Sequence, residues 1–223
     1  TTLPAVAQST VLTGDGGTVT GRSVTTGEEL WHYRRGEELC ALLAAWPGSE
    51  NLALAAYRNS RGCSEITGLD AATGERRGNR TSDADAEIEL SYGTGQVLAV
   101  GPWRLETWGA NLVRGIEYGR VDAPVNPGVF PNRDNCRIFS AVSGDDRVAV
   151  LERCEADRGY RLSVFSTNFD SEEQLEEWGS ELITETSTGA PPVVLGVNQT
   201  SVTVYDGGAD ATAPDATPTI RVF

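Results

Sequence analysis

Two similar stretches, SVTTGEELW at Ser23–Trp31 and LDAATGER at Leu69–Arg76, indicate how this chain folds. Each stretch places a Thr-Gly pair before a glutamate, between two strand-like runs. Glycine readily adopts the positive φ of a tight hairpin turn, so both pairs are predicted to be turns. Gly27 and Gly74 lie 47 positions apart (74 − 27), close to the length of a propeller blade, about 40–45 residues. The spacing therefore predicts a repeated β-sheet unit.

Short strand-like runs, separated by turn signals, continue along the rest of the chain. This regular spacing is typical of an all-β propeller or sandwich. The turns between the last two strands of successive groups recur every 37 to 57 residues, roughly, which fits blades with uneven loops better than a seven-stranded sandwich. The expected strands form five groups: Val11–Thr13, Thr18–Val24, Glu29–Tyr33; Cys40–Trp46, Asn51–Tyr57, Cys63–Leu69, Arg76–Arg80; Glu87–Tyr92, Gln96–Val100, Arg104–Trp108, Leu112–Tyr118; Cys136–Val142, Arg147–Cys154, Tyr160–Ser166, a segment near Trp178; and Pro192–Val197, Ser201–Tyr205, Thr217–Val222.

We therefore expect residues 1–223 to form a single all-β domain, a β-propeller of about five four-stranded antiparallel blades. The sequence does not decide whether the ring closes, because residues 1–7 look like an extended lead-in and the first group lacks its innermost strand. The chain could also be part of a larger propeller. Residues 121–134 and 207–218 are rich in Pro with Gly or Ala, and we expect them to be loops. The acidic run 170–177 is compatible with one or two turns of surface helix.

The repeat, an apolar strand followed by Asp or Thr, Thr-Gly, Glu and an aromatic residue, resembles that of quinoprotein-like (PQQ-like) β-propellers. The best match is SVTTGEELWHY from Ser23, and the second is GLDAATGER from Gly68. With YGRVDAPVNPG at Tyr118–Gly128 and its cysteines, the chain is also similar to uncharacterised cell-envelope proteins of actinobacteria. The resemblance implies a propeller, whose blades serve enzymes and scaffolds alike. Quinoprotein enzymes hold a quinone cofactor with calcium at the propeller axis, and the resemblance would imply such a site only if the ligands of that family were present. The vicinal cysteine pair of those enzymes is missing from this chain.

The charge of the chain excludes some partners. All 18 basic residues are arginine against 32 acidic residues, which gives a net charge of −14. Nucleic acid would be repelled unless the arginines clustered on one face. No apolar run approaches the roughly 18 residues of a membrane helix, although a signal peptide or an anchor upstream of Thr1 is compatible with the sequence.

The four cysteines indicate the compartment. Cys136 and Cys154 are centred on position 145, inside the expected turn of an antiparallel hairpin, so they should lie opposite each other and form a disulfide. Cys40 and Cys63 pair less directly and need a bulge or an adjacent-strand arrangement. Buried free thiols are the alternative. Two disulfides would indicate an oxidising, extracytoplasmic location, secreted or anchored in the cell envelope.

Few residues suggest chemistry. Asp83, Asp85 and Glu87 alternate along an extended segment and could offer oxygen ligands to Ca²⁺, although a solvated acidic loop is the simpler interpretation. Trp103 and Trp108 bracket a strand and are candidates for a binding face, whereas the tryptophans in general suit the core. His32, the single histidine, lacks partners for a zinc site and suits a surface strand position.

Two functions remain. The first is a non-catalytic propeller outside the cytoplasm that binds a protein or an envelope component, with no cofactor expected. The second is a cofactor- or metal-dependent enzyme, quinoprotein-like or a hydrolase, with its site at the propeller axis. No nucleophile elbow is found, and no pair of carboxylates is singled out for hydrolysis. The sequence favours the first.

Overall fold

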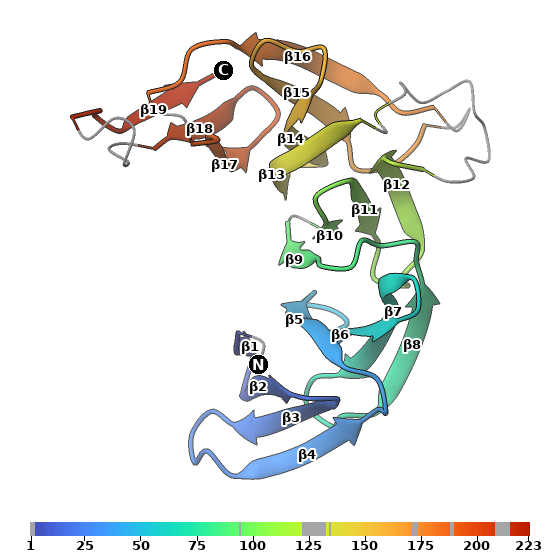
Figure 1. Cartoon of the computed structure of the whole chain (residues 1–223). Helices are drawn as coiled ribbons and strands as arrows, with labels where there is room; N and C mark the ends of the chain where they lie inside the picture. Colours follow the sequence, from blue (N-terminus) through green and yellow to red (C-terminus); the bar gives the residue numbers. More distant parts are fainter. Residues whose placement is uncertain are drawn as a thin grey trace. The chain divides into compact units, whose positions relative to one another are not determined.

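The computed structural model describes residues 3–93, 95–121, 133, 135–170, 174–187, 190–207 and 215–223, and within these ranges it contains strands and no helix (Figure 1). The strands are β1 Ala5–Ala7, β2 Thr10–Asp15, β3 Thr18–Ser23, β4 Glu29–Arg34, β5 Leu39–Ala45, β6 Leu52–Asn59, β7 Gly62–Asp70, β8 Arg76–Thr81, β9 Glu89–Tyr92, β10 Val97–Val100, β11 Arg104–Trp108, β12 Arg114–Gly119, β13 Cys136–Gly144, β14 Arg147–Cys154, β15 Tyr160–Ser166, β16 Glu177–Ile183, β17 Val193–Val197, β18 Val202–Asp206 and β19 Thr219–Val222.

These strands form five antiparallel sheets that follow the order of the chain. Four sheets have four strands each, β1–β4, β5–β8, β9–β12 and β13–β16, and the described part of the fifth has three, β17–β19. Neighbours in each sheet are consecutive in sequence, so every sheet is a simple meander. By compactness the chain divides into two units, and the division runs through the sheet β9–β12.

The first unit, residues 1–101 with 108–113, contains both Thr-Gly turns. Gly27 has a φ of 74° and Gly74 a φ of 75°. The amide of Gly27 donates to the carbonyl of Ser23 over 2.8 Å, and the amide of Gly74 donates to the carbonyl of Asp70 over the same distance. The Ser23 hydroxyl and the Asp70 carboxylate also accept hydrogen bonds. In each turn the donors are the backbone amides two and three residues further along the chain. The two turns are therefore the same structure, as the sequence repeat predicts.

Gly74 has a second reason to be glycine. A Cβ at this position would lie 2.6 Å from the indole of Trp31, and a Cβ at Gly21 would lie 2.2 Å from it. The Trp31 indole nitrogen donates to the carbonyl of Ala71 over 3.1 Å. The ring is thus held between two glycines, which fixes the first sheet against the turn of the second.

Strand β6 forms the centre of the first unit, and both of its faces are buried. Ala53, Ala55 and Tyr57 pack with the first sheet and Trp31. Leu52, Leu54 and Ala56, on the opposite face, pack with strand β10 and Trp108. This explains the apolar run LALAAY in place of the polar alternation of a strand that faces water on one side.

The second unit, residues 102–107 with 114–223, is built around the hairpin β13–β14. Asp145 and Asp146 have φ values of 49° and 62°, and Gly144 pairs with Arg147, so they are the two central residues of a tight turn. Positive φ at both positions is characteristic of the type I′ turn, whose twist suits antiparallel strands. The sequence-predicted turn is therefore confirmed, and it sets the register of the hairpin.

Two expectations about local structure are corrected. Residues 5–7, expected in an extended lead-in, form β1 and pair with β2, so the first sheet has all four strands. In the run expected as a surface helix, the described residues 170 and 174–176 are not helical and Glu177 begins strand β16. Pairing of β16 with β15 replaces the helix, because a sheet edge satisfies more backbone groups than an isolated turn does. Most of the segments 121–134 and 207–218, which we expected to be loops, lies outside the described residues.

Candidate functional site: an arginine and aromatic groove

Both expected disulfides are present. Cys136 and Cys154 lie directly opposite in the β13–β14 register, with Cα atoms 4.0 Å apart. Cys40 and Cys63 have Cα atoms 6.0 Å apart. The register shifts beside Cys40 and again beyond Tyr57, so a bulge provides the adjustment that this pair requires. The described residues contain no free cysteine.

A groove of about 300 Å³ opens beside the Cys136–Cys154 disulfide. The exposed aromatic side chains of Trp103 and Phe139 line it, with 37% and 36% of their surfaces accessible. The carbonyl of Pro102 accepts a hydrogen bond from the amide of Ile138 over 2.8 Å. This bond fixes the segment that bears Trp103 beside strand β13. The groove therefore combines two parts of the chain that are distant in sequence. Its lining residues are Trp103, Asn135, Arg137, Phe139, Arg153, Cys154 and Glu155.

Two arginines in the groove face each other across the hairpin. Arg137 pairs with Arg153 in the β13–β14 register, one position from the disulfide. Each guanidinium lies over an aromatic ring: Arg137 is 5.4 Å from the centre of Phe139, and Arg153 is 5.6 Å from the centre of Tyr160. Like charges directly opposite in a sheet are unfavourable. The structure of the second unit nevertheless holds them together, because the turn and the disulfide fix the register.

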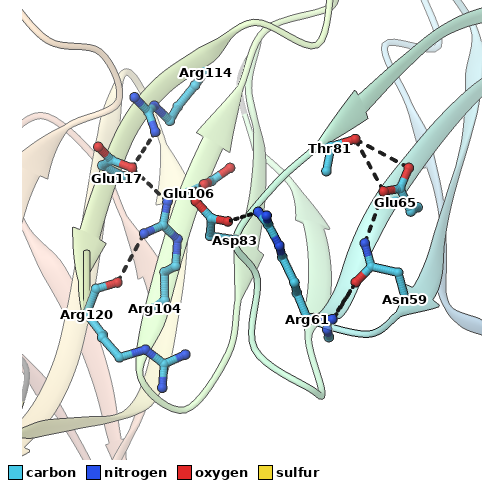
Figure 2. Close-up of polar contacts among 11 residues, drawn as sticks. Asn59, Arg61, Glu65, Thr81, Asp83, Arg104, Glu106, Arg114, Glu117 and Arg120 are labelled. Atoms are coloured by element: carbon cyan, nitrogen blue, oxygen red, sulfur yellow. Dashed lines mark hydrogen bonds and ion pairs between the residues drawn. The ribbon is translucent and has the colours of Figure 1, made fainter. Parts of the chain in front are cut away.

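A different group of charges is buried in strands β11 and β12 (Figure 2). The Arg104 guanidinium donates to Glu106 over 2.6 Å and to Glu117 over 2.7 Å, and all three side chains are almost fully buried. It also donates to the carbonyl of Arg120 over 3.0 Å, and Arg114 donates to Glu117. Burial lowers the pKa of Arg104, but the two carboxylates outweigh burial and raise it. Such a charge-paired cluster suits a structural role.

Glu152 is a further buried acid, and it lies on strand β14, two residues before Cys154 of the disulfide. Its side chain is fully buried, and it accepts a hydrogen bond from the Tyr118 hydroxyl over 2.7 Å. Arg133 approaches it at 3.5 Å. Burial raises the pKa of Glu152, opposed by the Tyr118 hydrogen bond and by the charge of Arg133. Burial also raises the pKa of Tyr118. This group supports the strand that carries Arg153 and is not among the residues that line the groove.

The three candidate calcium ligands differ in their exposure to solvent. Asp83 is exposed and forms an ion pair with Arg61 at 3.2 Å (Figure 2), Asp85 is buried and Glu87 is exposed. These three residues are not among the groups of potential metal ligands that lie close together in the described residues. Calcium binding at these residues stays a prediction.

The two candidate binding-face tryptophans have opposite environments. Trp103 is exposed in the groove, whereas Trp108 is fully buried among the core residues of the first unit. The assignment of Trp108 to a binding face is therefore wrong, because a side chain without accessible surface cannot contact a partner. Trp178, expected in the core with most tryptophans, is 52% exposed. The guanidinium carbon of Arg147 lies 3.2 Å from the centre of the Trp178 ring, and the ring borders another cleft of about 370 Å³.

The described residues offer little for metal chemistry. One group of three potential ligands lies close together in the part of the chain that the structure describes: Cys136, Glu152 and Cys154. Both sulfurs are joined in the disulfide and so are not thiolate ligands. His32 is exposed, and its ring pairs with Glu29 over 2.8 Å, which confirms the expected surface position on β4.

Sequence reasoning identified Trp103 but missed Phe139, Arg137 and Arg153. The information was present in the hairpin. A turn centred on position 145 that pairs 136 with 154 also pairs 137 with 153. Phe139 lies on the exposed face with Arg137, because Cys136 and Ile138 are buried and alternate residues of a strand share a face.

Comparison with known proteins identifies the fold. No protein-family model matches the chain, and no curated protein sequence matches it. Among solved structures, the computationally designed Ika8 protein aligns with 99% of this chain at a TM-score of 0.61 and 14% identity; this chain spans 57% of its length. BamB from Moraxella catarrhalis aligns over 100% of this chain and 76% of its own length, with a TM-score of 0.52 and 13% sequence identity. The β-propeller domain of Myceliophteria thermophila Cps50 (Swd1) aligns over 96% of this chain and 69% of its own length, with a TM-score of 0.51 and 15% sequence identity.

The chain has a β-propeller fold. Five successive antiparallel meanders and the likeness to solved propeller structures support this assignment. Identities of 13–15% show the fold alone. In the described residues, no helix has the length and apolar character needed to cross a membrane. The two disulfides are typical of an oxidising environment.

Proposed function

We propose that this protein is a non-catalytic, extracytoplasmic β-propeller that binds a protein or another component of the cell envelope. The observation that supports the proposal most directly is the groove of the second unit, which the exposed side chains of Trp103 and Phe139 both line. Large aromatic side chains and arginines are enriched at the centres of protein interfaces. Two disulfides support the extracytoplasmic location.

We further propose that the blades belong to the quinoprotein-like type and that the protein resembles actinobacterial envelope proteins. Support comes from the identical hydrogen bonding of the turns at Gly27 and Gly74. In this proposal the glycines shape the blades and bind no cofactor. An enzyme with a metal or quinone at the propeller axis is the alternative, and no cluster of side chains in the described residues favours it.

The proposal is tested by affinity capture from envelope fractions with the purified protein, followed by quantification of each captured protein. Trp103→Ala with Phe139→Ala should reduce capture of the specific partner at least tenfold, since truncation of an interface anchor typically costs about 2 kcal/mol or more. Trp178→Ala is the matched control, because Trp178 is also exposed but lies outside the groove. Equal capture by the double variant and the control would refute the groove as the binding face.

A further inference from the structure

The two guanidinium groups of the groove, those of Arg137 and Arg153, form no ion pair with the described residues. Each is exposed over an aromatic ring. Their register pairing holds them side by side. Glu155 is the single acid among the seven residues that line the groove, so the lining carries a net positive charge. The rest of the chain is acidic, with a net charge of −14 overall.

We infer that the groove binds an acidic peptide segment of the partner, in which carboxylates flank an aromatic or aliphatic side chain. The inference rests on the proposed function and specifies its ligand. Guanidinium groups bind carboxylates through two parallel hydrogen bonds, and a carboxylate placed between Arg137 and Arg153 would relieve their mutual repulsion. The apolar side chain of the peptide would contact Trp103 and Phe139.

The volume of the groove and the net charge of the protein favour a peptide over a nucleic acid as the ligand. About 300 Å³ accommodates a few side chains, at the lower end of the usual range for ligand pockets. A nucleic acid carries phosphates along its whole length, and those beyond the groove would meet a protein with a net charge of −14. A short acidic segment concentrates its charge at the two arginines. At physiological ionic strength the screening length is about 8 Å, so more distant acids repel it weakly.

The disulfide makes the pair of arginines a fixed element. Cys136 and Cys154 are covalently joined one position from Arg137 and Arg153 on the same two strands. The turn at Asp145 and Asp146 holds the other end of the hairpin. The backbone positions of the two arginines are therefore preorganised, so a ligand has to order their side chains but not the strands that carry them.

The test uses the purified protein with its disulfides intact and three fluorescein-labelled peptides: Gly-Glu-Glu-Phe-Glu-Glu-Gly, its analogue with Gln for every Glu, and its analogue with Lys for every Glu. Fluorescence anisotropy should show the Glu peptide binding at least tenfold more tightly than the Gln peptide, with the Lys peptide weakest. Because the arginines are exposed, the preference should fall severalfold between low salt and about 1 M salt.

The double variant Arg137→Gln, Arg153→Gln should lose the preference for the Glu peptide, whereas Arg76→Gln should keep it. Arg76 is an exposed arginine on β8 in the first unit, so its replacement removes one positive charge at another place. Equal binding of the Glu and Gln peptides, a preference retained by the double variant, no binding of any peptide at millimolar concentration, or tighter binding of a single-stranded oligonucleotide would overturn the inference. Loss of partner capture on Trp103→Ala, together with indifference to the two arginines, would overturn the inference and leave the proposed function intact.

Discussion

The second unit places arginines in two opposite situations, in strands β11–β12 and in the hairpin β13–β14. Arg104 is buried and meets two carboxylates at 2.6 and 2.7 Å. Arg137 and Arg153 are exposed, face each other, and have no ion pair in the described residues. A buried charge must be compensated within the fold, whereas an exposed one is compensated by water until a ligand arrives. The comparison separates a charge that is neutralised inside the fold from charges that are exposed to solvent.

The largest effect is expected from Arg104→Met, which removes the guanidinium and leaves Glu106 and Glu117 buried without their shared counter-charge. Breaking a buried pair in this way costs about 3–5 kcal/mol. Urea unfolding should show this loss in the free energy of unfolding. Arg137→Met is the control and should change stability by no more than about 0.5 kcal/mol. Similar losses in both variants would remove the distinction.

The next effect concerns the disulfide of the hairpin. Cys136→Ser with Cys154→Ser should lower the free energy of unfolding by about 3 kcal/mol, because the bridge closes a loop of moderate length in the unfolded chain. Cys40→Ser with Cys63→Ser in the first unit should cost about as much. Peptide binding by the folded protein should weaken in the first variant alone. Unchanged binding by the first variant, or equal weakening in both variants, would contradict a specific role of the hairpin disulfide in binding.

A smaller, pH-dependent effect is expected at Glu152. Burial raises its pKa above the ordinary value, so the folded state holds the proton more tightly than the unfolded state does. Stability from this group is fully present at pH values below its ordinary pKa and is lost as pH rises from there through its raised pKa. The loss amounts to about 1.4 kcal/mol for every pH unit that separates the folded-state pKa from the unfolded-state pKa.

Glu152→Gln should remove this slope from the curve of unfolding free energy against pH. Chemical unfolding across the mildly acidic to neutral range measures it, with Glu155→Gln as the control, because Glu155 is exposed just beyond the end of the same strand. A wild-type protein whose stability rises through this range by more than that of Glu152→Gln would contradict the assignment.

The smallest effect on stability is expected for the groove itself. Arg137→Gln with Arg153→Gln should leave the melting temperature unchanged or raise it slightly, since like charges opposite each other in a sheet cost roughly 0.2–1 kcal/mol. Differential scanning calorimetry detects such a change. A clear loss of stability would mean that the two arginines serve the fold, and the contrast with Arg104 would then disappear.

Much of the fold was predictable because the relevant signals are local. Thr-Gly before Glu sets a turn by backbone conformation alone, and the turns at Gly27 and Gly74 have the same hydrogen bonds. The pairing of Cys136 with Cys154 followed from the symmetry of one hairpin. Two expectations were wrong for the same reason: the extended lead-in, which forms β1, and the surface helix, where β16 begins. Short segments with weak propensity take the structure that a neighbouring strand imposes.

The sequence by itself predicted the all-β class, the blade-like repeat and the pairing of Cys136 with Cys154, because turns and hairpins depend on residues close together in the chain. Tertiary structure alone decided which side chains are accessible. Trp103 and Trp108 are five positions apart (108 − 103), yet one is exposed and the other buried. Burial depends on what packs from elsewhere, and so does the groove, which forms where the Pro102 segment joins β13.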